Sequence, residues 1–155
     1  MADKRLWLGF GHPDEESGLS GSTIAKYAAE GADVRIVIAT RGELGEIAPG
    51  SSATPEDVGV VREAEVRASV NVFGASLELL DYRDSGMPGT PENEDPRAFA
   101  QASMDEVVDH LVVSMRRHRP HVIVTFDEND GYGHPDHVMI SEATTLAFRA
   151  CGDSA

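Results

Sequence analysis

The sequence predicts an α/β domain with a Rossmann-like, three-layer α/β/α architecture and a mainly parallel sheet. Apolar runs alternate with longer amphipathic segments along the chain, which is the pattern of repeated strand–helix units. The apolar runs are nearly continuous in Val, Ile and Leu, as is typical of parallel strands covered by helices on both faces. In the common doubly wound arrangement, the four expected strands lie in the order 3-2-1-4. The chain of 155 residues is long enough for one such domain, and we take residues 1–155 as a single unit.

The N-terminal part of the chain is expected to hold two strands with a helix between them. Residues 5–11 form an apolar run that predicts the first strand. Residues 22–31 carry apolar side chains at helical spacing, and Gly31 ends the predicted helix. Residues 33–40 are again mostly apolar and rich in β-branched side chains, which predicts the second strand.

A loop rich in Gly, Ser and Pro then leads to a second helix and a third strand. Residues 54–73 predict the helix, because Pro55 falls in its first turn and acidic residues there face the positive end of the helix dipole. Gly74 ends this helix. The short apolar run at residues 77–82 predicts the third strand.

The C-terminal part of the chain predicts a long helix, a fourth strand and a last helix. Residues 95–119 predict the long helix, which opens at Asp95-Pro96 and turns Leu111 inward. Residues 121–127 predict the fourth strand and residues 135–150 the last helix. A four-stranded sheet leaves an open edge. We therefore expect either a domain truncated at its C-terminus or a partner at that edge, with a homo-oligomer as one form of it.

Composition narrows the classes of function. The 13 Lys and Arg residues against 27 Asp and Glu residues give a formal net charge of −14, and there is no basic cluster. Such a field repels phosphate backbones and attracts cations, so nucleic-acid binding is disfavoured. Cys151 is the only cysteine, which excludes an intrachain disulfide and favours the cytoplasm. The sequence has no apolar stretch of membrane-spanning length and no signal-peptide pattern at Met1, so no membrane partner is expected.

Two segments far apart in the chain carry His-Pro-Asp in the same setting. His12–Glu16 follows the first predicted strand, and His134–His137 follows the fourth. In the predicted order these strands are neighbours, and the crevice outside their carboxyl ends is the expected ligand site. One isolated His-Pro-Asp is usually a turn at a helix start, with acids that face the helix dipole. Two copies at adjacent strand ends favour a catalytic site instead.

The two segments together offer three histidines and four carboxylates, the residue types from which catalytic zinc sites are built. A histidine and an acid three residues apart can reach one ion across a turn, while the adjacent acid points towards its water. His134 and His137 share a face of the predicted helix, so one can bind the metal while the other faces the substrate. Asp136 can orient a neighbouring histidine or favour its protonated form.

At this point the motifs resemble those of the LmbE-like (PIG-L) N-acetylglucosaminyl deacetylases, which include a mycothiol-pathway deacetylase and a mycothiol conjugate amidase. The family's His-Pro-Asp-Asp-Glu motif reads His12-Pro13-Asp14-Glu15-Glu16 here, and its Gly-His-Pro-Asp-His motif is intact at Gly133–His137. Further signatures match at Thr40–Gly45, Arg62–Glu65 and Tyr82–Met87. The resemblance covers essentially the whole chain, although family members usually run beyond its C-terminus.

The resemblance implies a zinc ion bound by His12, by the second acid of the first motif and by His137. That acid is Glu15 in this chain, where the family has aspartate. Glutamate also binds zinc, but its extra methylene moves the carboxylate, so Glu16 stays open as the alternative ligand.

The resemblance also implies roles for residues that do not bind the metal. Asp14 would be the general base that takes a proton from the attacking water. His134, paired with Asp136, would lie beside the developing oxyanion, and Tyr132 would lie near the substrate carbonyl. The residues implied to line the sugar pocket are Arg62, Asp84, Glu43 and Ser17.

These observations together predict a zinc-dependent hydrolase that removes an N-acyl group, acetyl above all, from an amino sugar of the N-acetylglucosamine type. An amidase acting on thiol-conjugated pseudo-disaccharides is the alternative enzyme, and a non-catalytic metal- or sugar-binding protein is the alternative outside catalysis. A nucleotide-binding Rossmann protein is disfavoured, because the first strand-to-helix turn carries His-Pro-Asp in place of a Gly-rich phosphate loop. The expected partner is a small amino-sugar substrate.

Overall fold

Four parallel strands form one sheet within the residues that the computed structural model describes, 4–128 and 132–152. The strands are β1 (Arg5–Phe10), β2 (Asp33–Thr40), β3 (Ser76–Tyr82) and β4 (Val122–Val124). Their order is β3-β2-β1-β4, and each neighbouring pair is parallel. The predicted fold class and strand order are therefore confirmed. Both chain ends lie outside the described residues, as does Gly131.

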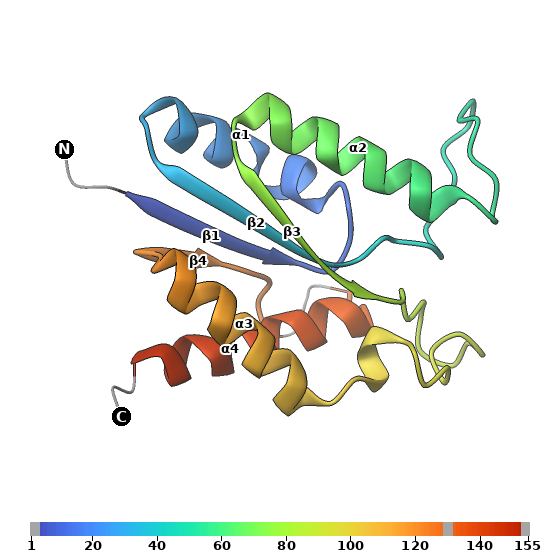
Figure 1. Cartoon of the computed structure of the whole chain (residues 1–155). Coiled ribbons are helices and arrows are strands. Elements are labelled where there is room, and N and C mark those ends of the chain that lie inside the picture. Colours follow the sequence, from blue (N-terminus) through green and yellow to red (C-terminus); the bar gives the residue numbers. More distant parts are fainter. Residues whose placement is uncertain (1–3, 129–131, 153–155) are drawn as a thin grey trace.

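Helices cover both faces of this sheet (Figure 1). The helices on one face are α1 (Glu15–Ala29) and α2 (Val58–Phe73), and those on the other are α3 (Met104–His118) and α4 (Pro135–Gly152). A short 3₁₀ helix, Phe99–Gln101, precedes α3. Within these described ranges, no helix has both the length and the apolar composition needed to cross a membrane.

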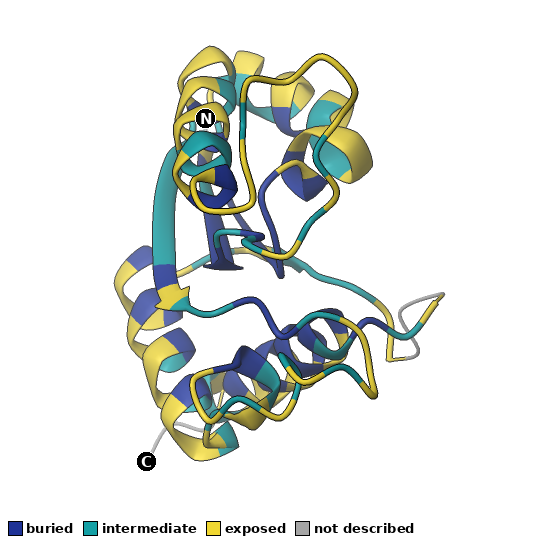
Figure 2. Cartoon of the chain, turned by 90° about the vertical axis from the view of Figure 1, so that its right-hand side faces the viewer, coloured by how far each residue is buried: buried dark blue, intermediate teal, exposed yellow. Residues whose placement is uncertain are grey.

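The alternation of side chains along β1 divides the core into two apolar layers. Leu8 and Phe10 face α1 and pack with Ile24, whereas Trp7 faces the other way and packs with Leu111 of α3. Figure 2 views the sheet from the carboxyl ends of its strands and shows buried residues on the strands and on the inner sides of the helices. Each fully buried apolar side chain of this size stabilises the fold by about 1.5–3 kcal/mol.

Helix α1 begins at Glu15, well before the predicted start at Ser22. The prediction missed the first turns because the intervening residues are mostly Ser and Gly, which are weak helix formers. Tertiary contacts stabilise these turns. The Glu16 carboxylate accepts the backbone N–H of Asp14 at 3.0 Å and the hydroxyl of Ser69, on α2, at 2.7 Å.

Helix α3 begins at Met104, and the prediction that it opens at Asp95 is wrong. The Asp95 carboxylate instead accepts the backbone N–H of Arg97 at 2.9 Å and pairs with the Arg97 guanidinium at 2.7 Å. Such a bond from a side chain to a nearby amide competes with helix formation. The segment is then tied to the end of β3, because Phe99 donates its N–H to the carbonyl of Arg83 at 2.8 Å.

Strand β4 is shorter than the predicted range 121–127, since it pairs with β1 only opposite Leu6–Leu8. Beyond Val124, the hydroxyl of Thr125 donates to the carbonyl of Gly9 at 3.0 Å, where a ladder amide would otherwise donate. The chain then turns towards the start of α4. The remaining boundaries agree with the prediction to within four residues.

Candidate metal centre

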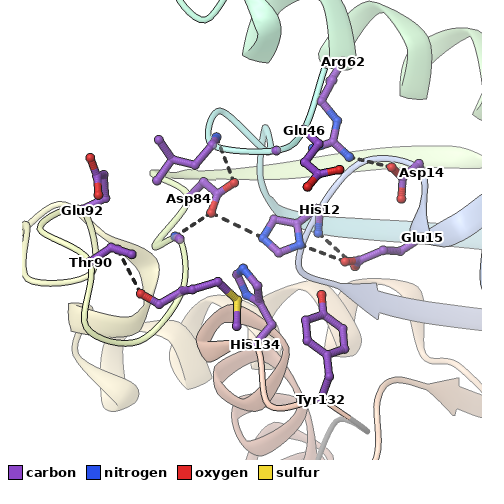
Figure 3. A pocket seen from close by; sticks show the side chains of 14 residues that line it. His12, Asp14, Glu15, Glu46, Arg62, Asp84, Thr90, Glu92, Tyr132 and His134 are labelled. Atoms are coloured by element: carbon purple, nitrogen blue, oxygen red, sulfur yellow. Dashed lines mark hydrogen bonds and ion pairs between the residues drawn. The ribbon is translucent and has the colours of Figure 1, made fainter. Parts of the chain in front are cut away.

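The two His-Pro-Asp segments meet at the carboxyl ends of β1 and β4. His12 follows β1, and His134 and His137 stand at the start of α4. Gly11 permits this approach, because a Cβ at that position would lie 2.9 Å from the His137 ring. A cavity of about 700 Å³ opens beside the segments (Figure 3). Its lining residues are His12, Asp14, Glu15, Leu44, Gly45, Glu46, Arg62, Asp84, Gly86, Met87, Thr90, Glu92, Tyr132 and His134.

Three potential metal-ligand atoms converge at one edge of this cavity. His12 Nδ1 lies 2.8 Å from Glu15 Oε1 and 3.0 Å from His137 Nε2, and His137 Nε2 lies 2.5 Å from Glu15 Oε1. Two imidazoles and one glutamate form a ligand set known from catalytic zinc sites, which keep a further position for water or substrate. The donor set and its convergence therefore fit a zinc ion, with the three residues that the motifs implied.

The Glu15 carboxylate is held in place by the backbone as well as by the histidines. Its Oε2 accepts the backbone N–H groups of Gly11 at 2.9 Å and His12 at 3.0 Å, which leaves Oε1 directed at the two imidazoles. Burial opposes ionisation, but hydrogen bonds and charge from His12 and His137 outweigh it and lower the pKa of Glu15 to about 2. An ionised carboxylate is the form that binds a metal.

Glu16 is also buried, but its carboxylate does not contact the histidines in the described structure. Its two carboxylate oxygens are occupied by the Asp14 amide and by the Ser69 hydroxyl, between α1 and α2. The structure therefore brings Glu15, and not Glu16, to the converging imidazoles. The longer side chain of glutamate reaches this position because the backbone N–H groups before α1 hold its second oxygen.

The other side of the His12 ring is bonded to carboxylates. Its Nε2 donates to Asp136 Oδ2 at 3.0 Å and lies 3.7 Å from Asp84 Oδ1. In the neutral ring this donation leaves the lone pair on Nδ1, as metal binding requires, and a bound cation would displace a proton from that atom. A carboxylate behind a ligating histidine is a common feature of zinc sites. Burial disfavours charge on the ring, but the neighbouring carboxylates of Asp136, Asp84 and Glu15 outweigh it and raise the pKa of His12 well above its usual value.

Ser85 completes this arrangement and was missed by the sequence analysis. It is fully buried, donates its backbone N–H to Asp136 Oδ2 at 3.1 Å, and bonds through its hydroxyl to Asp136 Oδ1. The only sequence signal was its place in the Tyr82–Met87 signature. Asp136 is thus held rigidly against His12.

Asp14 lines the cavity, and its carboxylate is paired with Arg62. It has a left-handed backbone, with φ of 87°, and its exposed carboxylate accepts Arg62 Nη2 at 2.6 Å. The Arg62 guanidinium also donates to the carbonyls of Pro13 at 2.8 Å and Gly42 at 3.1 Å. A Cβ on Gly42 or Gly45 would collide with this guanidinium, so the glycines of the Thr40–Gly45 signature leave room for Arg62.

His134 lies beside His12, with ring centroids 4.6 Å apart in an edge-on arrangement. Its Nδ1 accepts the backbone N–H of Asp136 at 3.2 Å, so the ring proton is on Nε2. Burial and the neighbouring His12 charge both lower the pKa of His134. The implied pairing with Asp136 therefore runs through the Asp136 amide, while the Asp136 carboxylate binds His12. Tyr132 lies at the mouth of the cavity, 6.2 Å from the His134 ring.

The remaining predicted pocket residues divide into two groups. Asp84 lines the cavity and accepts the amides of Leu44 at 3.1 Å and Gly86 at 2.8 Å. Burial opposes its ionisation, but the nearby His12 ring and these amides hold the pKa of Asp84 well below its usual range. Glu43 and Ser17 are not among the cavity lining. Glu43 accepts the Asp84 amide at 3.1 Å, and the Ser17 hydroxyl donates to the Asp14 carbonyl at 2.9 Å.

Two loops contribute a part of the cavity that the sequence analysis did not assign. The loop after β2 supplies Leu44 and Glu46, and the loop after β3 supplies Met87, Thr90 and Glu92. The sequence indicated these loops only by their position in the predicted fold. Both follow strands whose carboxyl ends lie at the same edge of the sheet as those of β1 and β4. Together with the motif acids, they give the cavity a strongly acidic wall.

Comparison with known proteins agrees with the motifs. The PIG-L family model, described as GlcNAc-PI de-N-acetylase, matches residues 9–148. Two similar relatives are 1D-myo-inositol 2-acetamido-2-deoxy-alpha-D-glucopyranoside deacetylases, from Rhodococcus erythropolis and Geodermatophilus obscurus. Each is 43% identical, with 98% of this chain and 55% of the relative covered. The chain thus spans about half the length of these curated relatives. A solved N,N'-diacetylchitobiose deacetylase from Pyrococcus horikoshii shares the fold at 23% identity, with a TM-score of 0.75 over 96% of this chain and 50% of that one.

Proposed function

The chain belongs to the PIG-L family, and we propose that it binds zinc and hydrolyses the N-acyl group, in the simplest case acetyl, of an amino sugar of the N-acetylglucosamine type. The observation that carries this proposal is the convergence of His12 Nδ1, Glu15 Oε1 and His137 Nε2 at the edge of a polar cavity. The deacetylase names of the relatives support the same reaction over the alternatives.

The zinc would be held by His12, Glu15 and His137. When bound, it supplies a Lewis acid that polarises an acyl carbonyl and lowers the pKa of water. Asp136 orients the His12 imidazole through Nε2, so that Nδ1 points at the donor atoms of Glu15 and His137. Glu15 stays ionised because two backbone amides and two imidazoles surround it.

The proton transfers are assigned to residues beside these ligands. Asp14 takes the proton of the attacking water and returns it to the departing amine. Its carboxylate is exposed, lines the cavity and is bonded to Arg62, so general-base action would require this ion pair to open. His134 donates Nε2–H to the oxyanion that develops on the acyl oxygen, and Tyr132 assists at the same oxygen.

The sugar is proposed to lie in the 700 Å³ cavity, where hydroxyl groups meet carboxylates and the Arg62 guanidinium. Arg62 and Asp84 would bind it directly. Glu43 and Ser17 would position these residues without contacting the sugar, because Glu43 accepts the Asp84 amide and Ser17 donates to the turn that carries Asp14.

The single cysteine of the sequence supports our proposal of a reducing compartment, the cytoplasm.

The test combines metal content with turnover. Elemental analysis should find one zinc per chain, and the protein should release acetate from N-acetylglucosamine or its glycosides until a chelator removes the metal. Zinc binding without acyl release from any such substrate would instead support a metal- or sugar-binding protein. No stoichiometric zinc would overturn the proposal.

The ligand assignment has its own matched pair of variants. Glu15→Ala should lose zinc, whereas Glu16→Ala should keep it and lose stability, because Glu16 bonds only to Asp14 and Ser69 in the described structure. Glu15→Asp should hold or raise zinc affinity, since aspartate is the family's ligand. Loss of zinc in Glu16→Ala together with retention in Glu15→Ala would shift the ligand by one residue.

A further inference from the structure

A second cavity, of about 540 Å³, lies on the other flank of the candidate metal centre. It shares Asp14, Glu15 and Tyr132 with the first cavity, and His137 reaches only the second. The converging donor atoms of Glu15 and His137 therefore stand at the junction between two cavities. Figure 3 shows Tyr132 on that side of the first cavity, with its hydroxyl directed towards His12 and Glu15.

The second cavity differs from the first in the character of its wall. The second cavity lacks Glu46, Asp84 and Glu92 of the first. The residues that line the second cavity alone are Gly18, Leu19, Phe126, Asp127 and His137. Phe126 stacks on the His137 ring, with centroids 4.1 Å apart and planes 6° from parallel, so one apolar surface runs directly up to a proposed ligand. Leu19 is 65% exposed on α1, which leaves a large apolar side chain uncovered beside the reacting centre.

We propose that the second cavity is the acyl subsite and that it accepts N-acyl chains longer than acetyl; this rests on the proposed function. A substrate amide placed at Glu15 and His137 has its sugar on one side and its acyl chain on the other. The polar cavity suits the sugar, and the apolar side of the second cavity, formed by Leu19 and Phe126, suits the chain. In the reaction the water oxygen bonds to the acyl carbon, the C–N bond breaks, and the amine and a free fatty acid leave from opposite cavities.

The acyl subsite can be tested by measuring ligand affinity in a variant that does not turn the ligand over. The zinc-loaded Asp14→Asn protein is titrated by calorimetry with N-acetyl-, N-butanoyl- and N-hexanoylglucosamine. Affinity should rise by about fourfold for each methylene that the cavity buries. Equal or falling affinity along the series would overturn the acyl subsite. The wild-type protein is assayed in parallel with the same three compounds. Absence of turnover with a rising affinity series would reject the hydrolase and keep the subsite.

Two cavity variants and one control variant locate the effect. Leu19→Asp places a charge in the second cavity and should lower the ratio of hexanoyl to acetyl affinity by at least tenfold. Val72→Asp makes a similar change at an 83% exposed position on α2 that lines neither cavity, and should leave the ratio unchanged. Gly18→Phe, whose Cβ would meet no atom within 4 Å, should fill the cavity and also lower the ratio. An unchanged ratio of hexanoyl to acetyl affinity in both Leu19→Asp and Gly18→Phe would show that the acyl chain binds elsewhere.

Discussion

Buried histidines lie at both ends of the parallel sheet, and their surroundings give them opposite properties. His12 follows β1 at the carboxyl end and is 8% exposed, while His118 ends α3 at the amino end and is 6% exposed. The pKa of His12 is raised well above the usual value, whereas burial lowers the pKa of His118. Burial alone therefore does not decide the chemistry of a histidine.

The difference arises from the groups that each ring meets. His12 meets the carboxylates of Glu15 and Asp136 at hydrogen-bond distance. His118 donates Nε2–H to the carbonyl of Leu6 at 3.2 Å, and its Nδ1 lies 3.6 Å from Asp33. The proposed ligands gather at the carboxyl edge because the segments after β1 and β4 meet there, while His118 at the amino edge packs against the start of β1.

The largest expected contrast is in metal binding. His12→Ala should abolish stoichiometric zinc, because it removes one of three converging donors, and His137→Ala should do the same. His118→Gln should keep full zinc content. Elemental analysis after dialysis measures all three variants. Full zinc in both motif variants would remove the metal centre from this end of the sheet.

A second contrast compares two aspartates that share an unusual backbone. Asp14 and Asp81 both have positive φ, 87° and 62°, and both pair with an arginine, Arg62 and Arg41 respectively. Asparagine tolerates this conformation, so both Asp→Asn variants should fold. Asp14→Asn should keep zinc and lose about 10²–10⁴-fold in kcat, as expected when a general base is removed. Asp81→Asn should keep its kcat. A near-normal kcat for Asp14→Asn would assign the base elsewhere.

A third contrast tests the carboxylates behind the two histidines. Asp136→Asn should lower zinc affinity by about 10–100-fold, because the His12 ring loses its charged acceptor. Asp33→Asn, beside His118, should leave zinc affinity unchanged. Competition with a chelator of known affinity gives both values. Equal effects in the two variants would mean that Asp136 acts through overall stability.

The smallest effect is a pH dependence at the amino end. Because the pKa of His118 is lower in the folded protein, the unfolded chain takes up a proton first as pH falls below about 6.5. Stability is therefore complete above that pH and falls below it, by at most about 1.4 kcal/mol per pH unit for one proton. The charged groups facing this ring are Asp33, Arg35 and Arg5. Urea unfolding of His118→Gln should show a shallower fall than wild type, and an unchanged slope would contradict this account.

Much of the fold followed from local pattern. The apolar runs that became β1 and β2 were predicted almost to the residue, because buried parallel strands carry continuous apolar sequence. The starts of α1 and α3 were not, because contacts distant in sequence decide them. Ser69 supports the first turn of α1, and the Phe99–Arg83 bond holds the segment before α3 out of a helix.

The sequence by itself determined that two histidine-bearing motifs follow apolar runs of a strand–helix chain. Two His-Pro-Asp motifs after apolar runs, in a chain that predicts the order 3-2-1-4, place His12 and His137 at neighbouring strand ends. The motifs depend on residue types, and the fold class depends on the alternation of strands with helices, so both can be read from local sequence.

Only the tertiary structure decided how these residues divide their work. Glu15 and Glu16 are adjacent and alike in sequence, yet backbone amides turn one towards the histidines and Ser69 holds the other between two helices. Arg62 and Ser85 acquire their partners across long sequence separations, with Asp14 and the Asp136 carboxylate. The orientation of a side chain and its hydrogen-bond partners depend on the positions of groups distant in sequence, which a local sequence pattern does not specify.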